Sequence, residues 1–445
     1  MTARVEVAAA RTGPGNMRAV LLFAAVAGLF VVTGFVQSWN VTLTILNMGL
    51  ISAIMALGVN MQWGYAGLFN VGVVGFVALG GLACVLIAHP PVTDAWAAGG
   101  PGVLAGLLLG AATLIGALLA WARLPKGRLR SVVTVAIVVV GYWAYRQVLD
   151  PAAARVEAVN PAGTGFLGGL GLPVLLAWPA GALMAAGAAW AIAKTALGLR
   201  SDYLAIATLG IAEIIIAVIK SEDWMTRGVK NVTGIPRPVP YEVDMLADPG
   251  FVAWALRNAF EPATAASIIV KLCYAGLFAA VLVALVILME LALKSPWGRM
   301  MRAIRDNEVA AEAMGKDVKA RHLQTFVLGS AVIGMAGAMM TTLDSQLTPG
   351  TYQPLRFTFL VWVMVIVGGS GNNWGAVLGG FLIWWLWVMV EPIGLWVMNV
   401  VTMGMPDGAL KKQLIDAAAH MRLLVMGVVL LFVLRFSPRG LLPEK

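Results

Sequence analysis

The sequence predicts an all-α, polytopic membrane protein. Of its 445 residues, 60% are hydrophobic and 12% are charged, whereas soluble domains average about 25% charged residues. The apolar residues occur in runs near the length that an α-helix needs to cross roughly 30 Å of hydrocarbon. The 50 glycines suit close helix packing in lipid. We therefore expect a single transmembrane domain over residues 1–445, with about 10–12 spans.

The apolar runs define the expected spans in order. They cover residues 17–36, 43–59, 68–88, 101–122, 131–148, 173–193, 203–219, 267–293, 323–343, 357–367, 375–400 and 421–436. The run 357–367 is short enough to predict a bent or partial span, and the glycines at 64–68 predict a broken entry to the third span. Segment 101–150 is expected as an inserted helical pair, with a peripheral or lipid-facing position favoured over a functional one.

The positions of Lys and Arg predict the orientation. Basic residues cluster at Lys126, Arg128 and Arg130 and in a polar segment at 295–321. An even number of spans puts both clusters on the side of the two chain termini, which the positive-inside rule makes cytoplasmic. Segment 221–266 then forms an external loop.

Two stretches outside the spans predict amphipathic helices. Phe251, Ala255 and Leu256 recur at helical spacing in the external loop, and a second stretch lies at 409–418. Such helices either rest at the bilayer interface or form a landing surface for an external partner.

The polar segment 295–321 separates two long apolar runs. Ser295 and Pro296 predict a helix start, with serine as the N-cap and proline at the first position. Asp306 is expected to cap a second short helix that ends at Gly315. We expect these two short helices to meet at an angle and form a rigid knob on the cytoplasmic side. The alternative is a solvated connector.

Five motifs identify a family resemblance. The segment EVAAEAMG at 308–315 resembles the EAA loop of ABC-importer permeases. The others are similar to motifs of branched-chain amino-acid permeases of the LivM type: GYAGLFNVGVVGF at 64–76, LRSDYLAIATLGIAEI at 199–214, VIVGGSGNNWGAVLGG at 365–380 and RFSPRGLL at 435–442. They occur in the family's order.

The resemblance implies a permease subunit in a bacterial cytoplasmic (inner) membrane. Its partners would be a homologous second permease, two cytoplasmic ABC ATPase subunits and an external substrate-binding protein. The solutes would be branched-chain or other hydrophobic amino acids, with urea, amides or small aromatic acids in related branches. The chain has no G-x-x-x-x-G-K-[ST] phosphate loop, so ATP hydrolysis is expected in a partner.

The EAA-like segment supplies the expected contacts with the ATPase. In these permeases the loop forms a coupling helix that inserts into a cleft of the ATPase subunit. The matching residues here are Arg305, Glu308, Ala311, Glu312, Ala313 and Gly315.

Candidates for the solute pathway are Gly64, Gly67, Asn70, Gly72 and Glu213. Irregular backbone in a membrane must line a cavity or be buried in protein, so the glycines with Asn70 suit either a water-lined path or close packing. An ionisable side chain within a span is a functional candidate by default. We therefore expect Glu213 to be either a pathway residue or an acid hydrogen-bonded to a neighbouring helix.

Other functional classes receive less support. A proton-coupled secondary transporter could use Glu213 as its carrier, but would have little use for the polar segment 295–321. No catalytic pattern appears, and His89, His322 and His420 lie far apart without metal-ligand spacing. We therefore expect no enzyme activity in this chain, no cofactor or metal, and no nucleic-acid partner.

Overall fold

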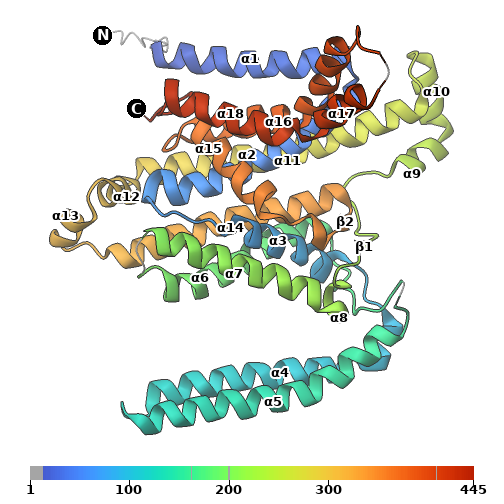
Figure 1. Cartoon of the computed structure of the whole chain (residues 1–445). Helices are drawn as coiled ribbons and strands as arrows, with labels where there is room; N and C mark the ends of the chain where they lie inside the picture. The colour runs from blue at the N-terminus through green and yellow to red at the C-terminus, as the bar shows by residue number, and fades with distance from the viewer. Residues whose placement is uncertain (1–13, 162, 199–200, 407, 445) are drawn as a thin grey trace, which may run out of the picture.

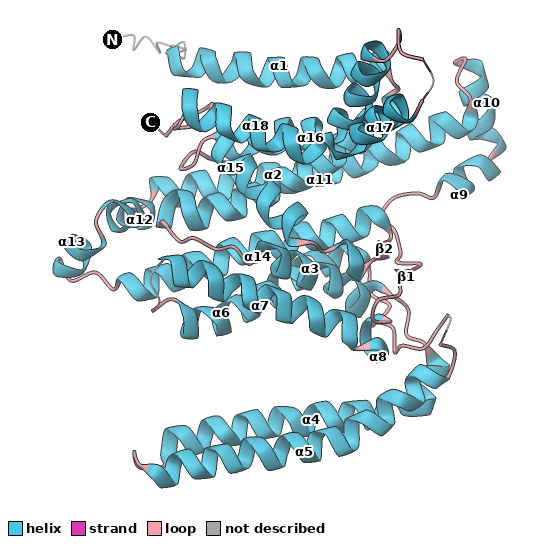
Figure 2. Cartoon of the chain, in the orientation of Figure 1, coloured by secondary structure: helices cyan, strands magenta, loops and turns pink. Residues whose placement is uncertain are grey.

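A computed structural model describes residues 14–161, 163–198, 201–406 and 408–444. Across these ranges the regular structure is helical apart from one antiparallel ladder between β1 (Val232–Thr233) and β2 (Gln346–Leu347) (Figure 2). Nine of the described helices are long and apolar enough to cross a membrane, or ten when α17 and α18 form one bent span. The all-α, polytopic fold is therefore confirmed.

Each of the twelve expected spans falls on a helix. These helices are α1 (Pro14–Val36), α2 (Trp39–Val59), α3 (Val73–Ala88), α4 (Thr93–Arg123), α5 (Arg128–Ala158), α6 (Ala177–Ala196), α7 (Ser201–Ser221), α11 (Pro262–Lys294), α14 (Val318–Asp344), α15 (Leu360–Gly368), α16 (Asn373–Val401) and α18 (Met421–Phe436). Leu199 and Arg200, which open one of the quoted motifs, lie outside the described residues.

Short elements connect the long helices. They are the π-helical turns η1 (Asn60–Gly64) and η4 (Leu355–Phe359), the 3-10 turns η2 (Val174–Leu176), η3 (Pro349–Thr351) and η5 (Ala418–His420), and the helices α8 (Asp223–Thr226), α9 (Glu242–Ala247), α10 (Pro249–Arg257), α12 (Pro296–Asp306), α13 (Glu308–Ala313) and α17 (Ala409–Ala417). The two expected amphipathic helices correspond to α10 and α17.

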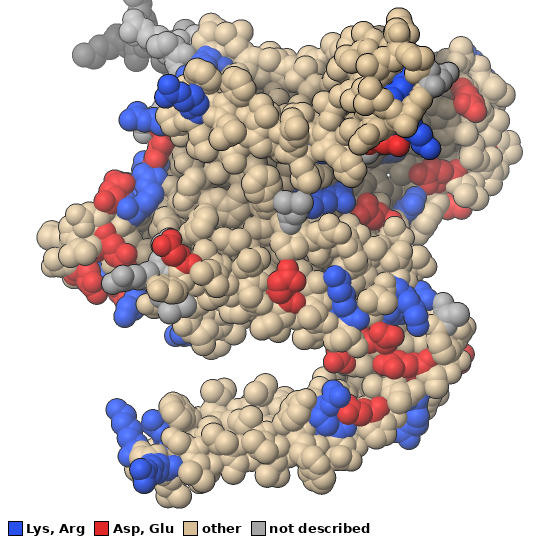
Figure 3. Space-filling model, viewed as in Figure 1, with Lys and Arg blue, Asp and Glu red and all other residues tan. Residues whose placement is uncertain are grey.

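The long helices run back and forth between two ends of the molecule (Figure 1). One end carries α12, α13, the start of α1 and the end of α18, whereas the other carries α8, α9, α10, α17 and the β-ladder. Lys and Arg gather at the α12 end and at the turn between α4 and α5, and the surface between the two ends is largely uncharged (Figure 3). This pattern fits a chain that crosses a bilayer.

The tightest packing joins α3, α6 and α14. Gly80 of α3, Gly181 of α6 and Gly334 of α14 meet at one point, where a Cβ on Gly181 would lie 3.1 Å from the Gly334 carbonyl oxygen and 3.1 Å from the Gly80 Cα. A Cβ on Gly80 would collide with the same carbonyl and would lie 2.8 Å from Ala338 N. Small residues thus let three backbones touch, as helix association in lipid requires.

The pair α4 and α5 forms a long hairpin that stands apart from the other helices (Figure 1). It spans more than the expected insertion at 101–150, because each helix has 31 residues. Its own small core, which includes Val103, Leu149 and Trp224, is separate from the main one and lies toward the end of the hairpin that carries α8. Apolar side chains cover most of the remaining hairpin surface.

We predict that Gly80→Ala destabilises the protein in detergent. The added methyl group has no room against the α14 backbone, and overpacking of this kind costs about 1–3 kcal/mol. The matched control is Gly187→Ala in α6, where a Cβ would meet nothing within 4 Å. Thermal unfolding of the purified variants should show a lower midpoint for Gly80→Ala alone. Equal midpoints for both variants would contradict the close three-helix contact.

Candidate functional site

The polar segment 295–321 forms the two short helices α12 and α13 between α11 and α14. Pro296 begins α12 as expected, but Ser295 does not cap it with its side chain: Ser295 Oγ donates instead to Ala292 O at 2.6 Å. Asp306 does not cap α13 either. Its carboxylate accepts from Arg305 at 3.3 Å, and Asn307 takes the capping position, with Asn307 Oδ1 accepting from Ala310 N at 2.9 Å. Ser295 therefore occupies the N-cap position of α12 as predicted but without a side-chain cap bond, whereas the predicted cap of α13 at Asp306 was wrong.

The α13 knob presents most of the expected coupling residues to solvent. Glu308, Glu312, Ala313 and Gly315 are exposed, whereas Ala311 is buried against the body of the protein. Gly315 has φ +76°, the left-handed conformation that ends a helix, as predicted.

Two apolar side chains stand out on the same knob and were missed from the sequence. Val309 is 77% exposed and Met314 is 79% exposed. The only available signal was an apolar residue at each end of a short, otherwise charged segment. An exposed apolar tip of this kind suits insertion into a partner's cleft.

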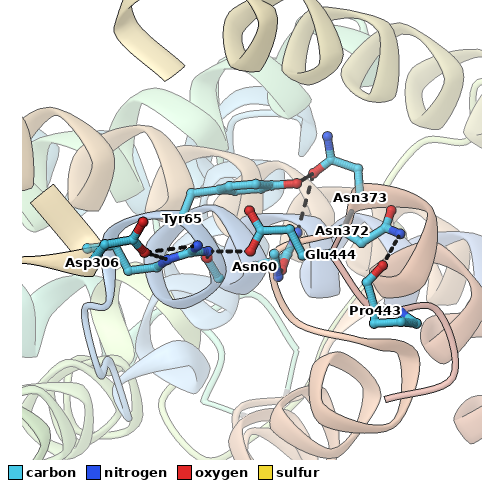
Figure 4. A network of polar contacts seen from close by, with 10 residues as sticks. Asn60, Tyr65, Asp306, Asn372, Asn373, Pro443 and Glu444 are labelled. Atoms are coloured by element: carbon cyan, nitrogen blue, oxygen red, sulfur yellow. Dashed lines mark hydrogen bonds and ion pairs between the residues drawn. The ribbon is translucent and has the colours of Figure 1, made fainter. Parts of the chain in front are cut away.

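Arg305 points inward, unlike the other coupling candidates. Its guanidinium donates to the Gly64 carbonyl oxygen and pairs with Glu444 at 2.8 Å. Burial disfavours the charged form, but the hydrogen bond and the attraction to Glu444 outweigh that effect and raise the pKa of Arg305. Arg305 therefore ties α12 to the break between α2 and α3 and to Glu444 in the C-terminal tail, which Figure 4 shows.

The C-terminal tail folds back along the turn between α15 and α16. Leu441 N donates to Val367 O at 2.8 Å, and Leu442 N donates to Gly368 O at 2.9 Å. Asn372 Nδ2 donates to Pro443 O at 3.3 Å, which brings the tail beside the N-terminus of α16. This contact could not be predicted from the sequence, because the tail and the turn are distant along the chain.

A second set of side chains joins the two helix breaks. Asn60 Oδ1 accepts from Gly371 N at 2.9 Å, and Asn60 Nδ2 donates to Asn373 Oδ1 at 3.3 Å. Tyr65 Oη donates to the same Asn373 oxygen at 3.2 Å, and Asn373 Nδ2 donates to Glu290 of α11 at 3.1 Å. Elements that flank α12 thus share one polar network (Figure 4).

Two adjoining cavities open at this end of the molecule. One, of about 600 Å³, is lined in part by Arg18, Lys294 and Asn372, and the other, of about 690 Å³, by Gly64 and Gly67. Arg302 and Glu444 line both. The network around Arg305 therefore borders open space as well as the knob.

The break between α2 and α3 is held by side chains of other helices. Gln62 Nε2 donates to Ser330 Oγ at 2.9 Å, Gln62 Oε1 accepts from Asn70 Nδ2 at 2.8 Å, and Asn70 Oδ1 accepts from Gly72 N at 2.9 Å. Thr208 Oγ1 of α7 accepts from Val71 N at 3.1 Å. The Val71 and Gly72 amides of the irregular backbone are thereby satisfied within the protein, as the hydrocarbon region demands.

The pathway candidates in this break occupy different surroundings. Asn70 is fully buried, and a Cβ on Gly72 would lie 2.5 Å from Thr208 O, which fits close packing. Gly67 is exposed with φ +69° and, with Gly64, faces the larger cavity. A pathway role for these four residues stays a prediction.

Glu213 lies apart from this network. It is exposed on the outward face of α7, near the middle of that helix, and makes no hydrogen bond or ion pair with any described residue. The alternative of an acid bonded to a neighbouring helix of the same chain therefore finds no support in the described structure. An exposed carboxylate at this depth is suited to a subunit interface or an aqueous path.

These features define a polytopic membrane permease: breaks within apolar helices, a polar network at one end and a protruding helical knob. A family model described as "Branched-chain amino acid transport system / permease component" matches residues 134–434, more than half of the chain. The chain belongs to this permease family. The resemblance to the LivM type is thus confirmed.

Three relatives illustrate the similarity. The probable LivM permease of Methanocaldococcus jannaschii is 28% identical over 56% of this chain and 61% of its own length. The high-affinity LivM permease of Escherichia coli is 25% identical over 60% of this chain and 56% of its own. A probable LivH permease of M. jannaschii is 30% identical over 24% of this chain and 34% of its own. No solved structure matches the chain significantly. The chain thus covers less than two thirds of each relative.

We predict that Arg305→Gln loosens the C-terminal tail, because Glu444 loses its cationic partner. Limited trypsin digestion should cleave faster after Arg439, which lies in the tail. The control is Arg299→Gln on the same helix, since Arg299 is exposed and donates to the nearby Lys294 carbonyl oxygen. Unchanged cleavage in Arg305→Gln would show that the ion pair does not hold the tail.

Proposed function

We propose that this chain is the membrane-spanning subunit of an ATP-driven ABC importer for branched-chain or other hydrophobic amino acids. It works in a bacterial inner membrane with both termini on the cytoplasmic side. The observation that carries the proposal is the α12–α13 knob, which protrudes from one end and is bonded through Arg305 to the break between α2 and α3 and to the C-terminal tail. Membership of the permease family supports it.

The knob couples ATP turnover to the transmembrane helices. Two cytoplasmic ATPase subunits supply the energy, one of them receiving α13 in a cleft. Closure of the ATPase pair moves α13, and α12 carries this motion into α11 and α14. Because a nucleotide can shift the equilibrium only through differential contacts, α13 binds the two ATPase states with different affinity.

A homologous second permease completes the transmembrane unit. The partial likeness to a LivH permease supports a paired arrangement of related subunits. Glu213 then faces either this subunit or the solute path between the two. At the opposite end, α9, α10 and α17 offer a landing surface for an external binding protein that delivers the solute.

The proposed solutes, hydrophobic amino acids, have alternatives. Urea, amides and small aromatic acids are the alternatives within the same family. A proton-coupled secondary transporter is the alternative from another class, with Glu213 as the proton carrier.

Copurification and transport test the proposal together. The complex is isolated from native membranes in mild detergent, its subunits are identified, and the complex is reconstituted in liposomes with its binding protein. We expect two ATPase subunits, a related permease and leucine uptake that requires ATP. A chain that purifies alone and transports with a proton gradient but without ATP would establish the secondary transporter instead.

We predict that Glu312→Lys and Gly315→Asp uncouple uptake from ATP hydrolysis while the protein stays folded. The first reverses a charge on the exposed face of α13, and the second strains the left-handed position that ends the helix, at a cost of about 1 kcal/mol. Uptake and ATPase rates are measured in the same vesicles. The control is Lys126→Glu in the α4–α5 turn, a charge reversal away from the knob.

The expected result is a loss of uptake per ATP hydrolysed in both α13 variants and a normal ratio in the control. Normal coupling in Glu312→Lys and Gly315→Asp would refute a coupling role for α13.

A further inference from the structure

An arginine at the entry to α15 is not used by the network at the α12 end. Arg356 lies on η4, the π-helical turn that leads from the β2 side of the molecule into α15. Single π-helical turns within membrane helices are rare and often mark functional sites. Sequence alone does not single out Arg356, because one arginine beside an apolar run is typical of the end of a span.

The guanidinium of Arg356 is held in place by aromatic rings. It lies 5.1 Å from the centre of the Phe357 ring and 5.6 Å from that of the Trp384 ring. Both rings are nearly buried, so they form a fixed surface under one side of the half-buried arginine. Aromatic stacking orients a guanidinium and leaves its edge free to form hydrogen bonds.

That edge has no acceptor within the described protein. Arg356 Nε is buried without a hydrogen-bond partner, and the two terminal nitrogens donate to none of the described residues and are not buried. No described carboxylate lies within 4.0 Å of the guanidinium. Arg422, by contrast, is paired with Glu391.

Two other charged groups act on Arg356 at longer range. The Asp344 carboxylate, at the end of α14, attracts it, and the Arg422 guanidinium repels it. An arginine at membrane depth normally faces a partner or a water-filled cavity, because burying an unpaired charge is costly. Since no described residue supplies an acceptor, an anion from outside the described residues would complete the surroundings of Arg356.

We propose that Arg356 binds the carboxylate group of the transported solute. The two accessible terminal nitrogens match the two oxygens of a carboxylate, the geometry of the strongest arginine hydrogen bonds. The Asp344 carboxylate, whose charge acts on Arg356 at longer range, would attract a positively charged amino group. The ligand class is a zwitterionic α-amino acid, and this inference rests on the proposed function and narrows its solute class against urea and amides.

The test uses the full transporter in proteoliposomes with its binding protein and ATP. Uptake of radiolabelled leucine is compared among wild type, Arg356→Gln, Arg356→Lys and the control Arg128→Gln, which removes a charge in the α4–α5 turn. Subunit stoichiometry and basal ATPase activity are measured for each variant. Since one binding protein serves all variants, its own preference does not affect the comparison.

We expect Arg356→Gln to reduce leucine uptake about tenfold or more, as for the loss of a specific polar contact to a ligand. Arg356→Lys should recover part of the uptake, because it restores the charge without the planar fork. Arg128→Gln should behave like wild type. A lysine rescue distinguishes binding of an anion from a packing role, in which lysine and glutamine would be equally poor.

Two results would overturn the inference. Wild-type uptake in Arg356→Gln, or equal loss in the glutamine and lysine variants with intact assembly, would remove Arg356 from the solute path while leaving the importer proposal in place. If Arg356→Gln fails to assemble, Arg356→Lys decides alone: near-complete loss in an assembled complex counts against the site. Wild-type transport restricted to urea or amides would instead refute the proposed amino-acid function and the carboxylate site with it.

Discussion

The structure depends on satisfying non-helical backbone inside an apolar bundle. Two helical paths break near the same end, between α2 and α3 and between α15 and α16, and each break exposes peptide groups that lipid cannot bond. Asn60 links the two breaks. It lies in the π-helical turn η1 after α2, and its side-chain oxygen accepts a hydrogen bond from Gly371 N in the turn between α15 and α16. The breaks are therefore joined, and neither can move without disturbing the other.

Arg305 extends this joint to the surface. It bonds to the Gly64 carbonyl oxygen at the end of η1 and pairs with Glu444, while its own helix leads directly to α13. A single charged side chain thus connects the protruding knob, the glycine-rich break and the C-terminal tail. Motion at the knob has a short, bonded route into the helices, which is the physical requirement for a coupling element.

Charged side chains of this protein differ in whether they have an acidic or basic partner within the chain. Arg305 and Arg422 have acidic partners within the chain, whereas Glu213 and Arg356 have none within ion-pair distance among the described residues. Unpaired charges in an apolar protein are costly, so these two mark the places where a partner, water or a solute is expected to complete the structure. Glu213 lies on α7 and Arg356 lies on η4, so each residue needs its own explanation.

The sequence by itself determined the fold class, the positions of the spans and the helical knob, because hydrophobic run length and helix punctuation are local properties. The motifs were also sufficient to identify the family. Tertiary structure alone decided which charges are paired: it turned Arg305 inward to Glu444, left Glu213 on an outward face and set Arg356 against Trp384. It also left the Ser295 N-cap without a side-chain bond and put Asn307, not Asp306, at the cap of α13. Each of these outcomes depends on which groups lie near each other after folding, and residue spacing along the chain carries little information about that.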